Sequence, residues 1–328
     1  MKVGPFDLPG YYFGDAVELL RELPDNSIHC CVTSPPYWGL RSYLAGDDPN
    51  KGLEIGAEAT PWDYVDTMTA VFREVRRVLR EDGTCWLNLG DTYAAGRGPQ
   101  VSDSKRRGQA PKDAWNGSSK VPDGLKAKDL CLIPYRVAIA LQKDGWWVRS
   151  NIVWEKANPM PESVSDRPTA AHESVFLLTK SGRYYYDSDA VREPDCGRAS
   201  GNKSRVVAAA GERQRTNTHL GSSVPWEPGP GRNLRNVWSM ATKPYKGSHY
   251  AAMPPALVEK CVKAGCPKGG IVMDPFLGSG TVAQVAEDHG RQWLGFDLDE
   301  RNEQLIRERT SQTSLLRLAY NGEDHVGN

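Results

Sequence analysis

Long apolar runs are missing from this chain of 328 residues. Nowhere do 18 apolar residues follow one another, and the opening segment "MKVGPFDLPGYYFGD" has no apolar stretch of signal-peptide length. We therefore expect neither a membrane span nor a secretory leader, and a cytoplasmic location is the default. The 39% of hydrophobic residues is enough for a packed core, so the sequence predicts a globular protein.

Metal-binding and disulfide patterns are also absent. The seven cysteines are scattered, and no pair has the C-x-x-C spacing. Cys261 and Cys266 lack the further cysteines or histidines that would complete a zinc site. We therefore expect reduced, mostly buried thiols and no bound metal.

The chain has no net charge, because 41 Lys and Arg residues balance 41 Asp and Glu residues. The charges are nevertheless unevenly distributed. Residues 96–128 contain eight basic and three acidic residues, and residues 196–248 contain nine basic and two acidic residues. Long polar stretches of this kind are also typical of flexible connectors. Two basic stretches on an otherwise acidic chain indicate binding to a polyanion.

Strand-like and helix-like segments alternate along the rest of the sequence. Strands are expected at residues 11–14, 27–33, 84–91, 146–154, 172–179, 236–240, 269–274 and 292–297, with β character also at 183–187. Helices are expected at residues 15–23, 61–82, 130–145, 254–265, 281–290 and 299–312. This alternation predicts an α/β protein with a mostly parallel sheet and helices on both faces. We expect one domain over 1–328, with inserted regions at 96–128 and 192–248 and a loose tail at 312–328.

The stretch "TSPPYWGLR" follows an apolar strand and contains two consecutive prolines. Proline donates no backbone hydrogen bond and fixes its own φ, so Pro35 and Pro36 would hold the backbone rigid where the strand ends. Ser34 precedes them and Tyr37 follows. The pattern predicts a hydroxyl, a rigid backbone and an aromatic ring held together where the strand ends. A strand ended by proline with a packed tyrosine is the structural alternative.

The stretch "MDPFLGSGTV" follows another apolar strand and opens a helix. Its small residues let backbone N–H groups approach a ligand at the helix N-terminus. The next strand ends at Asp297, nineteen positions after Gly278, where a carboxylate can accept hydrogen bonds from both ribose hydroxyls of a nucleoside. No lysine precedes Thr281 to make a P-loop, and the G-x-G-x-x-G spacing is missing. A nucleoside cofactor with little or no phosphate remains, and S-adenosylmethionine fits that description.

Together, "TSPPYWGLR" upstream and "DPFLGSGT" downstream resemble the DNA amino-methyltransferases of the permuted β type over nearly the whole chain. The resemblance implies a Rossmann-like methyltransferase fold with a circularly permuted motif order. It also implies methyl transfer from S-adenosylmethionine to the exocyclic amine of a base flipped out of double-stranded DNA. A serine at the first motif position resembles the cytosine-N4 group, and adenine N6 is the alternative. A non-catalytic DNA-binding protein with this fold is a further alternative, which the intact motifs make less favourable.

The resemblance assigns roles to individual residues. The catalytic residues it implies are Ser34, Pro35, Pro36 and Tyr37. The Ser34 hydroxyl and the Pro35 carbonyl would form a rigid pair of acceptors for the amine, and the tyrosine ring would be the surface on which the base stacks. The cofactor pocket it implies contains Asp15, His249, Asp274, Phe276, Gly278, Ser279, Gly280, Thr281 and Asp297. Asp15 is equally suited to cap the helix that follows it.

DNA contacts are expected near the first motif and in the second basic stretch. The residues expected to make them are Trp38, Arg41, Arg213, Arg215, Arg232 and Arg235. The sequence leaves three matters open: which bases are recognised, whether a cognate restriction endonuclease accompanies the protein, and whether it acts as a monomer or a homodimer.

Overall fold

The computed structural model describes residues 1–40, 42–94, 121–194, 231–242 and 253–310. The chain divides into two units, one formed by Met1–Asp187 with Arg235–Asn328 and the other by Ser188–Leu234. In the second unit, the short helix η3 (Asp189–Val191) precedes an antiparallel bridge between Glu193 and Arg232. Some predictions fall outside the described residues: the tail at 312–328, most of both basic stretches, and the residues Arg41, Arg213, Arg215 and His249.

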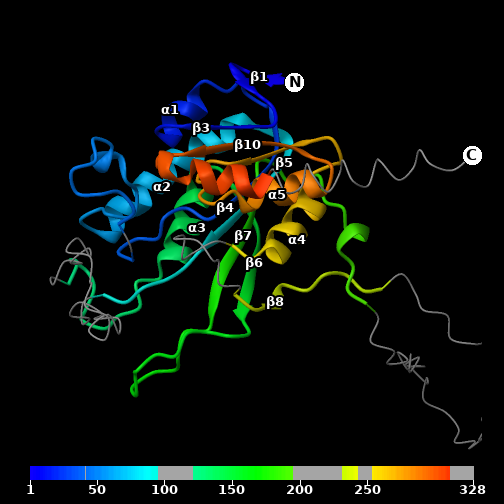
Figure 1. The fold of residues 1–328 in the computed structure, drawn as a ribbon. Coiled ribbons are helices and arrows are strands. Elements are labelled where there is room, and N and C mark those ends of the chain that lie inside the picture. The colour runs from blue at the N-terminus through cyan, green and yellow to red at the C-terminus, as the bar shows by residue number, and fades with distance from the viewer. Residues whose placement is uncertain (41, 95–120, 195–230, 243–252, 311–328) are drawn as a thin grey trace, which may run out of the picture. The chain divides into compact units, whose positions relative to one another are not determined.

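An eight-stranded sheet forms the first unit's framework (Figure 1). Its order is β3 (Gly10–Phe13), β10 (Gln292–Asp297), β9 (Ile271–Asp274), β4 (Ile28–Thr33), β5 (Leu79–Leu89), β7 (His172–Thr179), β6 (Trp147–Lys156) and β8 (Val237–Met240). Neighbouring strands from β3 to β5 are parallel, as are β6 and β8, whereas β7 is antiparallel to both of its neighbours. The predicted mostly parallel sheet is therefore confirmed. Strands β1 (Lys2–Val3) and β2 (Phe6–Asp7) form a separate antiparallel pair.

The two sequence motifs meet because their strands are neighbours. Strand β4 leads into the Ser-Pro-Pro-Tyr stretch, and β9 leads into the glycine-rich turn. Cys30 and Cys31 of β4 pair in parallel with Val272 and Met273 of β9. Parallel neighbours end at the same edge of a sheet, which is where ligands bind in open α/β folds. Segments far apart in the sequence are thereby brought together.

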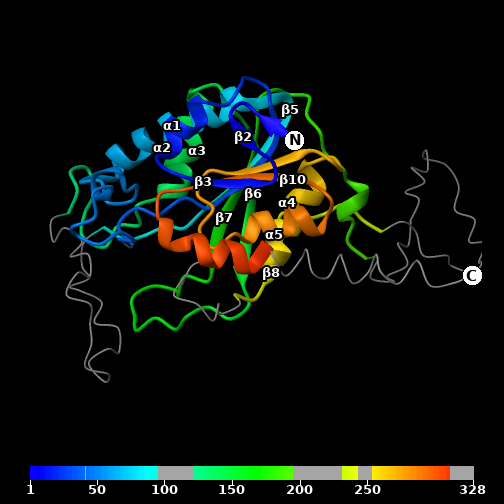
Figure 2. The same ribbon diagram turned by 45° about the horizontal axis from the view of Figure 1, so that its top comes forward.

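Helices cover both faces of this sheet, as the alternation of elements predicts (Figure 2). On one face lie α1 (Ala16–Arg21), α2 (Pro61–Val78) and α3 (Ile133–Lys143). On the other lie α4 (Pro255–Gly265) and α5 (Thr281–Asp288). Short 3-10 turns are η1 (Lys51–Leu53) and η4 (Glu300–Asn302), and residues 303–310 continue η4 as a helix. Within the described residues, none of the helices has the length and apolarity needed to cross a membrane.

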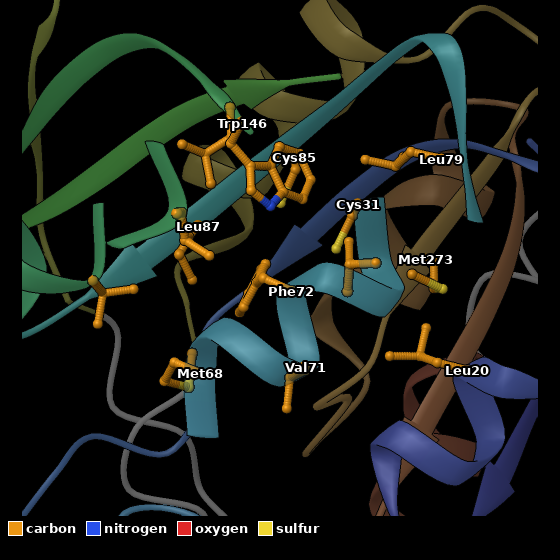
Figure 3. Packing of buried hydrophobic residues seen from close by; sticks show 14 of the residues in the cluster. Leu20, Cys31, Met68, Val71, Phe72, Leu79, Cys85, Leu87, Trp146 and Met273 are labelled. Atoms are coloured by element: carbon orange, nitrogen blue, oxygen red, sulfur yellow. The ribbon is translucent and has the colours of Figure 1, made fainter. Parts of the chain in front are cut away.

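The main core lies between α2 and the sheet (Figure 3). Met68, Val71 and Phe72 of α2 are fully buried and belong to one cluster with Cys85 and Leu87 of β5. The helix starts at a capping box, in which Thr60 and Asp63 each bond to the other's backbone N–H, and Pro61 occupies its first turn. This packing fixes the position of β5, which borders the Ser-Pro-Pro-Tyr stretch.

The largest differences from the expected elements lie at the end of α2, at the start of β5 and at residues 183–187. Helix α2 ends at Val78 rather than near residue 82, and β5 already begins at Leu79. Leu79 is fully buried and pairs with Ile28, so burial in the sheet outweighs its helix propensity. Residues 183–187 form no strand: Tyr185 N bonds instead to the Asp82 carbonyl outside any ladder.

Candidate active site

A cavity opens at the carboxyl ends of β4, β9 and β10. It encloses about 1040 Å³ of space, open solvent at its mouth included. Its lining includes nine residues that the sequence analysis singled out: Asp15, Ser34, Pro36, Asp274, Phe276, Gly278, Ser279, Thr281 and Asp297. Leu44, Ile55 and Met253 add an apolar part to the wall. The structure thus gathers residues of both motifs around one space.

The glycine-rich turn between β9 and α5 depends on two left-handed glycines. Gly278 has φ +52° and Gly280 has φ +79°, a region that side-chain-bearing residues rarely adopt. Gly280 is the N-cap of α5, and a Cβ there would lie 3.3 Å from the Ile306 Cα. The Gly278 N–H donates a 2.6 Å hydrogen bond to Asp297 Oδ2, which ties the turn to the end of β10.

Asp297 is held by three donors. Besides the Gly278 N–H at Oδ2, its Oδ1 accepts from the Asp299 N–H at 2.8 Å and from Asn302 Nδ2 at 3.1 Å. Burial nevertheless raises the pKa of Asp297 to about 6. Asp15, on the same cavity wall, caps α1 by accepting the Val17 N–H at 2.9 Å and the Glu18 N–H at 3.0 Å, all at Oδ1.

Asp274 connects the two motif strands. It is almost fully buried, accepts a 2.6 Å hydrogen bond from the Thr33 hydroxyl and a 3.0 Å bond from the Phe276 N–H. Thr33 is the last residue of β4 and directly precedes Ser34. Burial raises the pKa of Asp274 to about 7, since only these two donors offset the loss of water. The contact fixes the Ser-Pro-Pro-Tyr stretch against the glycine-rich turn.

A polar network surrounds the Tyr37 hydroxyl. It donates to Glu173 Oε2 at 2.7 Å, accepts from Asn88 Nδ2 at 2.7 Å and lies 3.1 Å from Ser34 Oγ. Asn88 Nδ2 also bonds to Glu173 Oε2 at 2.9 Å. The other carboxylate oxygen of Glu173 accepts from Lys156 Nζ at 2.5 Å. Burial, and next the Glu173 charge, raise the pKa of Tyr37 well above its usual value, so the phenol stays protonated.

Tyr64 and Gly90 fix the position of the stretch around Tyr37. The buried Tyr64 hydroxyl donates a 2.9 Å hydrogen bond to the Pro36 carbonyl, anchoring the double proline to α2. Gly90 lies against the tyrosine ring so closely that a Cβ there would be 2.6 Å from Tyr37 Cε2. The ring position therefore requires glycine after β5.

Of the residues expected to contact DNA, the structure describes Trp38, Arg232 and Arg235. The Trp38 ring is buried in the core and its Nε1 donates to the Glu58 carbonyl at 2.9 Å, which argues for packing rather than DNA contact. Arg232, in the second unit, forms a 2.8 Å ion pair with Glu193. The Arg235 carbonyl accepts from Trp238 Nε1.

Three members of the polar network were not predicted from the sequence. Asn88, Lys156 and Glu173 come from strands β5, β6 and β7, separated in sequence from the first motif. The available signal was a polar residue inside an apolar strand, as in "CWLNLG" and "HESVF". That signal names no partner, because pairing of β7 with β5 and β6 is what brings the three together.

The described cysteines offer no further reactive group. All six are free and buried, as expected. Burial raises the pKa of Cys30 and Cys31 well above the usual thiol value, which keeps both in the unreactive thiol form. The described residues contain no group of three or more His, Cys, Asp or Glu side chains arranged to hold a metal ion.

Comparison with solved structures defines the class of protein. The chain aligns with the PvuII DNA methyltransferase (cytosine-N4-specific) at a TM-score of 0.60 and 19% identity, covering 92% of this chain and 85% of that one. It aligns with a Thermus thermophilus protein complexed with S-adenosyl-L-methionine at a TM-score of 0.55 and 23% identity, covering 92% and 93%. The fold is the Rossmann-like fold of S-adenosylmethionine-dependent methyltransferases.

Sequence comparison narrows the class to a family. The N6/N4 methyltransferase family, described as DNA methylase, matches residues 28–308. The chain is also 42% identical over 311 residues to the Type II methyltransferase M.XycI of Xanthomonas campestris pv. cyanopsidis, covering 93% of this chain and 89% of that protein. The chain therefore belongs to the N6/N4 family of DNA methyltransferases, and the resemblance seen in its motifs is confirmed.

Proposed function

We propose that this methyltransferase modifies the exocyclic N4 of cytosine in double-stranded DNA, with S-adenosylmethionine bound in the cavity at the ends of β4, β9 and β10. The observation that carries the proposal is that Ser34 lies in the same cavity wall as the 274–281 turn and Asp297. Serine at this motif position favours cytosine over adenine. The PvuII DNA methyltransferase, which shares the fold, is cytosine-N4-specific, and this supports the same choice.

The cavity residues suit S-adenosylmethionine. A carboxylate oxygen has two acceptor positions, so Asp297 Oδ2 retains one for a ribose hydroxyl beside the Gly278 N–H. Leu44, Ile55 and Met253 offer the apolar surface that an adenine ring requires. When bound, the cofactor supplies an electrophilic methyl group on a positively charged sulfur. The rest of the chemistry falls to this chain's own side chains.

The amine of cytosine is a poor nucleophile because its lone pair is delocalised into the ring. Acceptors that hold both amine protons turn the lone pair out of the ring plane and towards the cavity. Ser34 Oγ is one acceptor and the Pro35 carbonyl is the other. The Pro36 carbonyl already accepts from Tyr64, whereas no hydrogen bond among the described residues uses the Pro35 carbonyl. Because the two prolines hold this carbonyl rigidly, the geometry exists before the base arrives.

Tyr37 receives the flipped base. The target nitrogen is out of reach inside a duplex, so the base leaves the stack and needs a new surface. Stacking on an aromatic ring contributes about 1 to 3 kcal/mol per base. Gly90 supports the Tyr37 ring and the hydroxyl network fixes its tilt.

DNA recognition is assigned to the basic residues. We place it in the region 192–248, including Arg213, Arg215, Arg232 and Arg235, with help from residues 96–128. The support is the concentration of positive charge on an otherwise acidic chain. The Type II designation of M.XycI supports a cognate restriction endonuclease as a partner.

Substitution of Ser34 tests the proposed mechanism. Ser34→Ala should lower the single-turnover rate of methyl transfer by about 10²- to 10³-fold, as expected for a lost positioned polar contact, with cofactor affinity unchanged by calorimetry. Ser27→Ala is the matched control, because Ser27 precedes β4 at its opposite end and its hydroxyl bonds to the Pro24 carbonyl, away from the cavity. Wild-type activity in Ser34→Ala would remove Ser34 from the mechanism.

A further inference from the structure

The proposed mechanism requires the Ser34 hydroxyl to accept a hydrogen bond from the base, and it does not explain why this hydroxyl accepts rather than donates. A hydroxyl can donate or accept, and only an accepting oxygen holds the amine in the required orientation. If Ser34 pointed its proton at the amine nitrogen, it would bind the lone pair that must attack. The site therefore needs a device that keeps this proton away from the base.

The network around Tyr37 fixes the proton directions one after another. An ionised Glu173 carboxylate can only accept, so the single Tyr37 proton lies in the 2.7 Å bond to Oε2. Tyr37 then has no proton left for the 3.1 Å contact with Ser34 Oγ, and the serine must be the donor there. With its own proton committed to Tyr37, Ser34 can only accept from the amine of the base.

Lys156 and Asn88 both donate hydrogen bonds to the Glu173 carboxylate. Lys156 Nζ, 2.5 Å from Oε1, stabilises the negative charge. Asn88 directs Nδ2 at Glu173, Tyr37 and Ser34, because the reverse orientation would place its carbonyl against the carboxylate. Its buried Oδ1 then has no hydrogen-bond partner among the described residues, which is costly. That Oδ1 is left without a partner indicates that the network requires the Nδ2 group of Asn88 as a hydrogen-bond donor.

We propose that Glu173 is a positioning residue which, through Tyr37, keeps the Ser34 hydroxyl in its accepting orientation. The inference rests on the proposed role of Ser34 in holding the target amine. Glu173 itself does not touch the base. It acts two hydrogen bonds away, so its effect must pass through the Tyr37 hydroxyl.

A double-mutant cycle tests this series arrangement. Glu173→Gln keeps the shape but offers one oxygen and one donor group to neighbours that are themselves donors, so the proton directions are no longer fixed. Tyr37→Phe removes the hydroxyl and keeps the ring for stacking. Each should lower the single-turnover rate by about 10- to 100-fold, as expected for a lost bond to a charged group. The KM for DNA and the affinity for S-adenosylmethionine should change by less than about twofold, because neither binding surface is altered.

The rate of the double variant Tyr37→Phe/Glu173→Gln shows whether the two residues act in series. Because Glu173 acts only through Tyr37, the double variant should be no slower than the slower single variant. Rate losses that multiply would overturn the proposal, since Glu173 would then act independently. Glu81→Gln is the matched control: Glu81 is also paired with a lysine, at 3.2 Å, but its side chain is 73% exposed.

Two further outcomes separate this inference from the proposed function. A wild-type rate in Glu173→Gln overturns the positioning role, while N4-methylcytosine in the product would still support the function. Should Glu173→Gln fail to fold, Tyr37→Phe alone decides: an unchanged rate refutes the chain of bonds, and a slower rate with unchanged KM for DNA supports it. Full activity of Ser34→Ala would instead remove the basis of both.

Discussion

Replacing Gly90 by alanine perturbs the active site through a single added carbon. The new Cβ would lie 2.6 Å from Tyr37 Cε2 and 2.8 Å from Cδ2. Carbon atoms settle at about 3.5 to 4.0 Å, so the ring must retreat by roughly 1 Å. The backbone at Gly90 has no positive φ and tolerates alanine, which confines the effect to the ring.

The displacement is large on the scale of the hydrogen bonds. The Tyr37 hydroxyl lies 2.7 Å from Glu173, 2.7 Å from Asn88 and 3.1 Å from Ser34, and a shift of about 1 Å takes such contacts out of hydrogen-bond range. A misplacement of this size costs about 10²-fold in rate. We expect single-turnover methyl transfer by Gly90→Ala to fall by that order, with cofactor affinity unchanged.

The control for this experiment is Gly46→Ala. A Cβ on Gly46 meets nothing within 4 Å, so the same substitution should leave the rate unchanged. Thermal melting establishes that both variants are folded. A folded Gly90→Ala enzyme with the wild-type rate would refute the claim that the position of Tyr37 controls the chemistry.

Three other predictions concern the cofactor turn, a buried carboxyl and the basic residues. Gly278→Leu should abolish S-adenosylmethionine binding in calorimetry while the protein stays folded, since the φ of +52° and the close backbone approach both require glycine; unchanged affinity would move the pocket elsewhere. Burial raises the pKa of Asp274 to about 7, so between about pH 4 and 7 the folded state binds a proton that the unfolded state has released. The free energy of unfolding should therefore fall as the pH rises from about 4 to 7, by at most about 1.4 kcal/mol per pH unit. Asp274→Asn should flatten that slope in melting experiments, and an unaltered slope would contradict the burial argument. Neutralising Arg213, Arg215, Arg232 and Arg235 together should weaken DNA binding and flatten its salt dependence. An unchanged salt dependence would place the DNA elsewhere.

The fold was largely predictable from local pattern. The apolar runs of β4, β9 and β10 and the turn "DPFLGSGT" indicated buried parallel strands and a ligand-binding loop, because periodicity and glycine placement are local properties. The end of α2 was not predictable in this way. Helical spacing continues past Val78, and only the pairing of Leu79 with Ile28 shows that the chain has entered the sheet.

The candidate site was predictable only where it follows a motif. Ser34 and Asp297 are marked by their neighbours in the sequence, whereas Glu173 and Lys156 matter because β6 and β7 pair antiparallel beside β5. For Trp38, a position next to a motif did not indicate where the side chain packs. Its place beside Tyr37 suggested a DNA contact, yet its ring packs in the core and its Nε1 donates to the Glu58 carbonyl.

The most direct test of the proposed function is the chemical identity of the methylated base. The purified enzyme should be incubated with double-stranded DNA and S-adenosylmethionine, and the digested DNA analysed by mass spectrometry, with Ser34→Ala in parallel. We predict N4-methylcytosine from the wild-type protein and almost none from the variant. N6-methyladenine would contradict the choice of base, and 5-methylcytosine would contradict the mechanism, because that product requires attack by a cysteine and Cys30 and Cys31 are fully buried.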